Sequence, residues 1–230
     1  MITPYSLIQT MTRNLLKYLA PALLTAVVFA ACSKDEGSDY ETLTAEMAEI
    51  HTSSAGVLDY ADTDNGVRLT FTKALKSSQM ATPDSLYRVF LYYNKAESGQ
   101  PVELLSLVAV AVPSIHTPAE AKSWYGEQDP LTLVSAWRSA NGKYLNLNLT
   151  LMSGATEDDE HHLLGLVCDS TVTEASGRKH TYFRLTHSQG GVPAYYSTTQ
   201  YLSIPLSGIT SADPITLTFP TSAGTQSRDM

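Results

Sequence analysis

The stretch "LTLVSAWRSANGKYLNLNLTLMSG", residues 131–154, decides the fold class of this chain. Leucines at positions 145, 147, 149 and 151 alternate with Asn146, Asn148 and Thr150. Period-two alternation is typical of a strand with one buried face, because successive side chains of a strand point to opposite faces. Asn141-Gly142, just before it, is a strong signal for a hairpin turn. The stretch therefore predicts an antiparallel β-hairpin.

The chain beyond this hairpin continues with strand-like segments. Its apolar and β-branched segments are separated by turn residues, with no helical pattern between them. Antiparallel strands without intervening helices predict a β-sandwich, which we place at residues 114–222, followed by a flexible tail at 223–230. The segments are "HHLLGLVCD" (161–169), "HTYFRLTHS" (180–188), "STTQYLSIPL" (197–206) and "PITLTF" (214–219).

The N-terminal half, residues 41–113, is predicted to be a second β domain. Asn65-Gly66 lies between two strand-like segments and is another hairpin signal. The segment "VELLSLVAVAV" (102–112) is nearly all apolar and predicts a strand buried on both faces. "ETLTAEMAEIHTS" (41–53) fits one face of a helix as well as a strand. About five strands in this length predict a small barrel of the OB type, so the whole chain is predicted to be all-β.

The segment "PSIHTPAEAKSWYGEQDP", residues 113–130, interrupts the strand pattern. Its three prolines and mixed polarity predict a connection between the two domains, with a short helix around Ala119–Trp124. Each domain is thus expected to have its own core.

Charge argues against a nucleic-acid partner. The 230 residues carry a formal net charge of −8, and Lys and Arg are scattered singly, with only Arg178 and Lys179 adjacent. A surface that neutralises phosphates needs clustered Lys and Arg. We therefore predict that the chain does not bind nucleic acid.

The first residues predict a lipoprotein signal peptide at 1–31. Arg13 and Lys17 precede "YLAPALLTAVVFAAC", an apolar run too short for a membrane span, which ends at Cys32. Ala30-Ala31 before Cys32 resembles a bacterial lipobox, so Cys32 is the predicted lipid attachment site. Residues 32–40 then form an acylated cysteine and an acidic tether. The alternatives are an uncleaved anchor and a start at Met11, and the expected location is the outer membrane, facing the cell surface or the periplasm.

Taken in order, these pieces resemble the NigD-like family of Bacteroidetes lipoproteins. A lipobox is followed by "DNGVRL" (64–69), "YRVFLYYNKAES" (87–98), "DPLTLVSAWRSANGKYLNLNL" (129–149), "HHLLGLV" (161–167) and "FRLTHSQG" (183–190). The resemblance implies an N-terminal OB-like domain and a C-terminal β-sandwich, but it does not imply any particular activity or catalytic residue. The insert "MATPDS" (80–85) and the acidic loop "ATEDDE" (155–160) depart from the family pattern. The residues that match the family pattern, and that we expect to be structural, are Asp64, Gly66, Trp137, Tyr144, Asn146 and His187.

The stretch "EDDEHH", residues 157–162, is the candidate for a metal site. Glu160, His161 and His162 supply types of side chain that bind zinc, but neighbours on a regular strand point to opposite faces and cannot chelate one ion together. An acidic loop leading into a strand, with His162 on the same face as Leu164, is the favoured interpretation. A weak cation site and a metal-dependent hydrolase remain as alternatives. No cofactor is predicted.

Aromatic residues offer a candidate for ligand binding. Tyr195, Tyr196 and Tyr201 would stack on sugars if they shared an exposed surface, and would pack across strands otherwise. Trp137 is expected in the core, and His187 is expected to order the adjacent Gly190-Gly191 turn by hydrogen bonding. These interpretations favour a lipid-anchored, non-enzymatic module that binds a protein partner in the cell envelope. A lipoprotein that binds a glycan or another small ligand is the second hypothesis.

Overall fold

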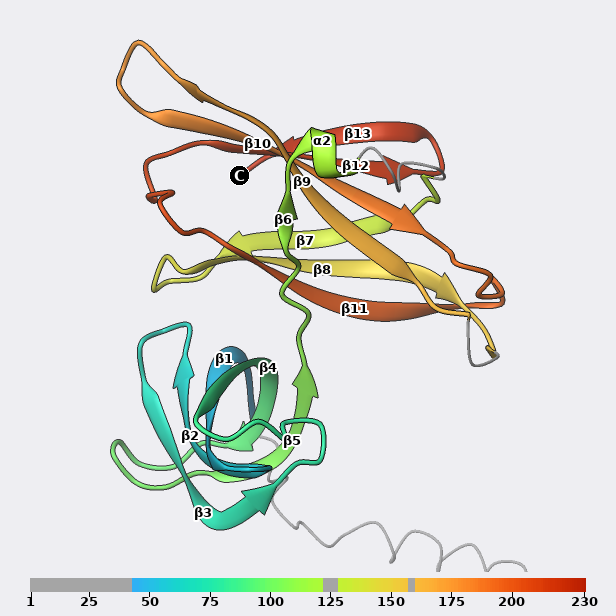
Figure 1. Cartoon of the computed structure of the whole chain (residues 1–230). Coiled ribbons are helices and arrows are strands. Elements are labelled where there is room, and N and C mark those ends of the chain that lie inside the picture. The colour runs from blue at the N-terminus through green and yellow to red at the C-terminus, as the bar shows by residue number, and fades with distance from the viewer. Residues whose placement is uncertain (1–42, 122–127, 157–159) are drawn as a thin grey trace, which may run out of the picture. The chain divides into compact units, whose positions relative to one another are not determined.

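The computed structural model describes residues 43–121, 128–156 and 160–230. The predicted signal peptide at 1–31, Cys32 and the predicted tether at 32–40 lie outside these residues. Strands make up most of the described chain, and no helix in it is long and apolar enough to cross a membrane. The all-β prediction is confirmed (Figure 1).

The N-terminal domain is one antiparallel sheet with the strand order β3-β2-β1-β4-β5. The sheet curls until its two edges meet, where Phe71 and Val102 form a parallel bridge. The Val102 N–H donates to the Thr70 carbonyl at 2.8 Å, and the Thr72 N–H donates to the Val102 carbonyl at 3.0 Å. These contacts close an OB-like barrel. Its strands are β1 (Leu43–Ser54), β2 (Val57–Thr63), β3 (Arg68–Lys76), β4 (Ser85–Asn94) and β5 (Glu103–Ala109).

Alternation explains how the barrel fills its interior. In β4, Val89, Leu91 and Tyr93 point into the core, while Arg88 and Phe90 lie on the opposite face. The segment that also fitted a helix is β1, which pairs with β2 and β4 along most of its length. The buried cluster comprises Ala48, Ile50, Leu58, Ala61, Leu69, Met80, Val89, Leu91, Tyr93 and Val102.

Strand β5 corrects the prediction of a strand buried on both faces. Leu104 and Leu107 pack against the barrel core, whereas Leu105 and Val108 are 51% and 47% exposed. A closed barrel has only one interior, so an apolar run in its wall leaves every second side chain outside. The composition of β5 alone does not reveal this.

The C-terminal domain is a β-sandwich of two sheets. One has the order β13-β12-β10-β9-β6 and the other has the order β11-β8-β7. Pairing is antiparallel except between β10 and β12 and between β6 and β9. The strands are β6 (Ile115–His116), β7 (Thr132–Arg138), β8 (Tyr144–Ser153), β9 (Leu163–Thr173), β10 (Lys179–Ser188), β11 (Tyr196–Pro205), β12 (Ile215–Thr221) and β13 (Gly224–Asp229).

The leucines of β8 form the centre of the sandwich core, as their alternation predicts. Leu145, Leu147 and Leu149 are 0% exposed, and they belong to one buried cluster with Phe183 and Leu217 of the other sheet. Each such leucine contributes about 1.5–3 kcal/mol by burial. Both predicted Asn-Gly turns are present: Gly66 and Gly142 have φ of +79° and +72°, which glycine adopts without strain.

The predicted flexible tail at 223–230 is wrong. Residues 224–229 form β13, which pairs with β12 from Thr216–Asp229 to Thr221–Gly224. Its side chains are all exposed and polar. The strand is held by main-chain hydrogen bonds and by polar side-chain bonds such as Thr216–Asp229 and Thr218–Ser227, which leave no hydrophobic pattern in the sequence.

The connection between the domains contains the short helix α2 (Pro118–Ala121). The Glu120 N–H donates to the Thr117 hydroxyl at 3.3 Å, and the Thr117 N–H donates to the Glu120 carboxylate at 2.7 Å. This reciprocal pair is a capping box, which starts the helix at Pro118. The helix was predicted around Ala119–Trp124, and residues 122–127 lie outside the described ranges.

Candidate functional site

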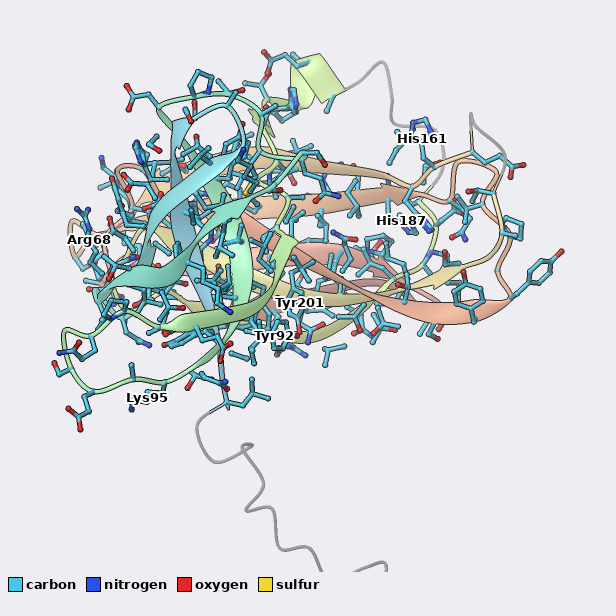
Figure 2. The ribbon with its side chains drawn as sticks, turned by 90° about the horizontal axis from the view of Figure 1, so that it is seen from below. Arg68, Tyr92, Lys95, His161, His187 and Tyr201 are labelled. Carbon is cyan, nitrogen blue, oxygen red and sulfur yellow. The ribbon has the colours of Figure 1, made fainter. Side chains whose placement is uncertain are left out.

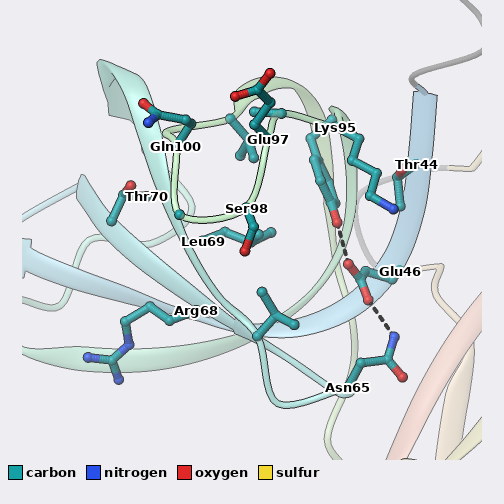
Figure 3. Close-up of a pocket in the computed structure, with 15 residues that line it drawn as sticks. Thr44, Glu46, Asn65, Arg68, Leu69, Thr70, Lys95, Glu97, Ser98 and Gln100 are labelled. Atoms are coloured by element: carbon teal, nitrogen blue, oxygen red, sulfur yellow. Dashed lines mark hydrogen bonds between the residues drawn. The ribbon is translucent and has the colours of Figure 1, made fainter.

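A cavity of about 490 Å³ opens at one end of the barrel (Figure 3), and we call it the barrel-end cavity. The start of β1, the β2–β3 turn, the first half of β3 and the loop from 95 to 102 line it. Both apolar and polar side chains line it, which suits a ligand with both kinds of surface. Polar groups come from Thr44, Glu46, Asn65, Arg68, Thr70, Tyr93, Lys95, Glu97, Ser98 and Gln100, and apolar groups from Val67, Leu69, Ala96 and Val102.

Glu46 of β1 is a charged group of this cavity that two hydrogen bonds hold in place. Its carboxylate accepts a hydrogen bond from the Tyr93 hydroxyl at 2.5 Å and another from the Asn65 amide at 2.9 Å, drawn as dashed lines in Figure 3. Burial of the phenol and this hydrogen bond raise the pKa of Tyr93 well above its ordinary value of 10. Tyr93 is therefore a permanent donor, and Glu46 is held in one orientation.

A second cavity, of about 290 Å³, lies next to the first and is called here the junction cavity. Glu46 and Asn65 line both cavities, and Phe90 and Trp137 line only the second. Trp137 is 37% exposed, so its predicted place in the core is wrong. The reason is its register: Trp137 pairs with Asn146, so it lies on the sheet face opposite the core leucines.

Residues of the barrel and the sandwich meet in a buried polar cluster, which we call the joining network. Arg88 of β4 donates to both carboxylate oxygens of Asp64, at 2.7 and 2.6 Å. It also donates to the Asn146 side-chain oxygen and to the Ser203 hydroxyl, both at 3.0 Å. The Asn146 amide donates to Asp64 at 2.8 Å, and the Ser203 hydroxyl donates to Asn146 at 2.8 Å. The guanidinium of Arg88 thus has hydrogen-bond acceptors around it, and the Asp64 carboxylate compensates its buried charge.

Tyr144 extends this network to the surface. Its ring lies over the Arg88 guanidinium, 4.2 Å from the centroid, and its hydroxyl donates to Glu49 at 2.8 Å. The Lys143 ammonium pairs with the other oxygen of Glu49 at 2.5 Å. Burial and the bond to Glu49 raise the pKa of Tyr144 to about 12.

The family-pattern residues therefore fall into two places. Asp64, Tyr144 and Asn146 belong to the joining network, and Gly66 forms the turn that follows Asp64. Trp137 lines the junction cavity beside them. His187 lies elsewhere in the sandwich. The structure thus brings together residues that are up to 82 positions apart in sequence, as between Asp64 and Asn146.

The histidine-rich stretch does not form a chelating pair. His161 is exposed, whereas His162 turns inward, and its Nδ1 lies 3.1 Å from His187 Nε2. Burial, with the neighbouring His187, lowers the pKa of His162. In the part of the chain that the structure describes, no group of three His, Cys, Asp or Glu side chains is placed to hold a metal ion. Residues 157–159 lie outside that part, and Glu160 lies against Gly191.

His187 has partners other than those predicted. It is 1% exposed, and its Nδ1 lies 3.1 Å from the Asp129 carbonyl. The Asp129 N–H donates to the His187 carbonyl at 2.9 Å, so His187 fixes the segment that leads into β7 rather than the glycine turn. The backbone of the turn instead passes so close to His161 that only glycine fits, since a Cβ on Gly190 would lie 2.0 Å from the His161 carbonyl oxygen.

The three tyrosines do not form one surface. Tyr195 and Tyr196 are 80% and 57% exposed. Tyr201 is half-buried and stacks on Phe90 of the barrel, with ring centroids 4.7 Å apart, beside Tyr92 (Figure 2). The pair Tyr195–Tyr196 is thus the exposed aromatic surface, and Tyr201 belongs to the contact between the domains.

One group of side chains has the outline of a catalytic triad. His180 Nε2 lies 2.8 Å from the Thr216 hydroxyl, and His180 Nδ1 lies 3.6 Å from Glu174. The Thr216 hydroxyl, however, donates to Asp229 at 2.6 Å, so its proton does not point at the histidine. A nucleophile activated by a base must donate to that base. We interpret the group as cross-strand hydrogen bonding that holds β13.

Sequence reasoning missed Glu46, Arg88 and Tyr93. The signal for Arg88 is present in "LYRVFLYYN", where it breaks an otherwise apolar outer face of the strand. Glu46 has no such signal, because its importance depends on the approach of Tyr93 and Asn65 from other strands.

Comparisons with known proteins agree with this fold. Residues 112–229 match the family described as the NigD-like C-terminal beta sandwich domain. No curated protein matches the chain. A crystal structure of a NigD-like immunity protein from Bacteroides caccae is 23% identical, covers 81% of this chain and 91% of that one, and has a TM-score of 0.61.

Two further crystal structures have the same fold. A protein described as toxin related, from Parabacteroides distasonis, is 15% identical, with 82% of this chain and 92% of that one covered and a TM-score of 0.62. A protein of unknown function from Bacteroides vulgatus is 16% identical, with 82% and 90% covered and a TM-score of 0.61. Because the domain match spans more than half of its residues, this chain belongs to the NigD-like family.

Proposed function

We propose that this chain is a non-enzymatic binding module of the cell envelope, anchored to the outer membrane through acylated Cys32, and that its partner is a protein. The observation that carries the proposal is the barrel-end cavity, which three separate segments of the barrel build around an ordered carboxylate. Its volume of about 490 Å³ falls within the range of ligand sites. OB barrels bind their ligands with strand faces and with the loop between strands 4 and 5, and here that loop lines the cavity.

A protein partner fits the proposed membrane anchor at Cys32 and the acidic tether that follows it. A short acidic tether from a lipidated Cys32 keeps the barrel within reach of other envelope proteins. The name immunity protein, carried by the relative from Bacteroides caccae, is compatible with a protein partner, and at 23% identity it supports the fold alone.

The test is photo-crosslinking of the anchored protein in its native envelope. A photo-reactive amino acid at Ser98, in the loop that lines the cavity, should yield a defined protein adduct. The same amino acid at Ala175, an exposed residue of the β9–β10 hairpin, is the matched control and should not. The adduct should disappear in Cys32→Ser, which cannot be lipidated. A folded, anchored protein that gives no adduct at position 98 would contradict the proposal.

A glycan ligand is the second candidate, and the exposure of Tyr195 and Tyr196 favours it. Exposed aromatic rings stack on apolar sugar faces. Binding of soluble polysaccharide, lost when both tyrosines become alanine and kept in Tyr201→Ala, would support this candidate. Retention of the polysaccharide by the double variant would rule out the tyrosine surface.

A further inference from the structure

Two glutamates of β1 each accept a hydrogen bond from a tyrosine hydroxyl and differ in their second partner. Glu49 accepts a hydrogen bond from the Tyr144 hydroxyl at 2.8 Å, and Lys143 neutralises it at 2.5 Å. Glu46 accepts one from the Tyr93 hydroxyl at 2.5 Å, and the neutral amide of Asn65 takes the place that Lys143 has at Glu49. Within residues 43–121, 128–156 and 160–230, no cation is paired with Glu46.

The cations near Glu46 have other partners. In the junction cavity, Arg138 donates to the Thr210 carbonyl at 2.8 Å and to the Asp213 carbonyl at 2.5 Å. Arg68, in the barrel-end cavity, forms a bidentate pair with Asp62. Asp64, the other carboxylate of the junction cavity, is already paired with Arg88.

Lys95 is the remaining cation of the barrel-end cavity. It is exposed, and Figure 3 shows its side chain extending towards Thr44. Glu46 forms no ion pair with any of these cations, and it is a half-buried carboxylate at the boundary of two cavities. Partial burial strengthens its field, because water screens it less than it screens a surface group.

The junction cavity adds an aromatic surface to this carboxylate. Trp137 lines it together with Glu46, and 37% of the residue remains exposed to solvent. Tryptophan is the aromatic residue that attracts cations best, through the negative face of its ring. A cavity of about 290 Å³ holds the end of one long side chain.

We propose that Glu46 and Trp137 form a binding site for a lysine or arginine side chain of the protein partner. The carboxylate pairs with the charged end, and the indole covers the cation or its methylene stem. Tyr93 and Asn65 hold the carboxylate in place, so little freedom is lost when the cation enters. This inference rests on the proposed function and gives it a ligand chemistry.

The test titrates purified full-length protein with three probes of similar length: N-acetyl-lysine methylamide, N-acetyl-arginine methylamide and N-acetyl-norleucine methylamide. Calorimetry measures affinity, and the change in tryptophan fluorescence that is lost in Trp137→Leu reports on Trp137, since Trp124 also fluoresces. The two cationic probes should bind at least tenfold more tightly than norleucine, and their affinity should fall with added salt.

Glu46→Gln should weaken binding of the cationic probes at least tenfold, because glutamine still accepts from Tyr93 but has no charge. Trp137→Leu should weaken it several-fold. Glu49→Gln is the matched control and should bind as the wild type does, because Lys143 already neutralises Glu49. Circular dichroism and thermal melting check that each variant folds.

Equal binding of norleucine and lysine, or unchanged binding by Glu46→Gln, would overturn this inference. Its failure is separable from failure of the proposed function. If the protein adduct at position 98 persists in Glu46→Gln, the chain binds a partner by other chemistry. If both the adduct and probe binding are absent from folded wild type, the binding module itself is contradicted.

Discussion

Two Arg–Asp pairs in this protein have the same geometry and different surroundings. Arg68 donates two hydrogen bonds of 2.7 Å to the Asp62 carboxylate, and Arg88 donates hydrogen bonds of 2.7 and 2.6 Å to the Asp64 carboxylate. The side chains of the first pair are 58% and 37% exposed, and those of the second are 2% and 10% exposed. At the scale of single residues, burial decides how much such a pair matters, since removing one partner of a buried pair leaves an uncompensated charge.

We expect Asp64→Asn to reduce the free energy of unfolding by about 3–5 kcal/mol, because Arg88 then remains buried without its counter-charge. Asp62→Asn is the matched control, and its effect should be much smaller because solvent screens the exposed Arg68. Urea unfolding followed by circular dichroism measures both. Equal losses in the two variants would show that the joining network is no more important than a surface pair.

Gly190 is a second residue whose environment decides its role. Gly190→Ala should be clearly more destabilising than Gly177→Ala. Both glycines have positive φ, +58° and +85°, which costs about 1–2 kcal/mol for alanine. A Cβ at Gly177 meets nothing within 4 Å, whereas at Gly190 it would lie 2.0 Å from the His161 carbonyl oxygen. Thermal unfolding of the two variants gives the difference, and matching melting temperatures would contradict the close approach.

At the scale of elements, the sandwich depends on a loop that joins distant strands. The Asp213 carboxylate, in the turn before β12, accepts from the Lys179 N–H of β10 and from the Thr210 N–H and hydroxyl, all at 2.8 Å. The turn thereby starts the parallel pairing of β10 with β12, which begins at Thr181 and Ile215. The backbone donors, Lys179 first, lower the pKa of Asp213 to about 2.

The stabilisation by Asp213 should therefore depend on pH. The folded-state pKa is below the ordinary 3.8, so the stabilisation is complete above about pH 5 and is lost as pH falls through 3.8 towards 2. Asp213→Asn should be less stable than wild type at pH 7, and the difference should shrink towards zero near pH 2. Urea midpoints measured across this range test it. A difference that stays constant down to pH 2 would argue against an ionised Asp213 as the cause.

At the scale of the whole described chain, two domains with separate cores are joined by side chains of β4. Arg88 and Phe90, on the outer face of that strand, contact Asn146, Ser203 and Tyr201 of the sandwich. Contacts between domains are often small enough to permit relative motion, but the hydrogen bonds of the buried Arg88 to Asn146 and Ser203 and the Phe90–Tyr201 stack oppose it. The barrel and the sandwich should thus unfold together.

A double-mutant cycle of Phe90→Ala and Tyr201→Ala should give a coupling energy of about 0.5–1.5 kcal/mol, the value of a stacked aromatic pair. A second cycle that combines Phe90→Ala with Tyr195→Ala is the control. Tyr195 is 80% exposed, and its cycle should give no coupling. Urea unfolding supplies the free energies, and a Phe90–Tyr201 coupling near zero would show that this stack does not join the domains.

Much of the fold could be predicted because it depends on local patterns in the sequence. The β8 leucines, the Asn65-Gly66 and Asn141-Gly142 turns and the all-β class all depend on neighbours within a few residues. The errors come from residues whose surroundings are set at long range. The apolar strand around Trp137 predicts a core residue, but the pairing with Asn146 places Trp137 on the outer face of the sheet. The polar residues of β13 predict a tail, but they pair with β12.

The candidate site could hardly be predicted at all. Most of the strands, the Asn-Gly turns and the resemblance to the family follow from the order of residue types along the chain, and the acidic charge follows from its composition. Three features follow only from the spatial arrangement: the compensation of Arg88 by Asp64, the place of Tyr201 in the contact between domains, and the lack of an ion pair at Glu46 among the described residues. Charge compensation and burial are properties of neighbours in space, and curled sheets bring those neighbours from distant parts of the sequence.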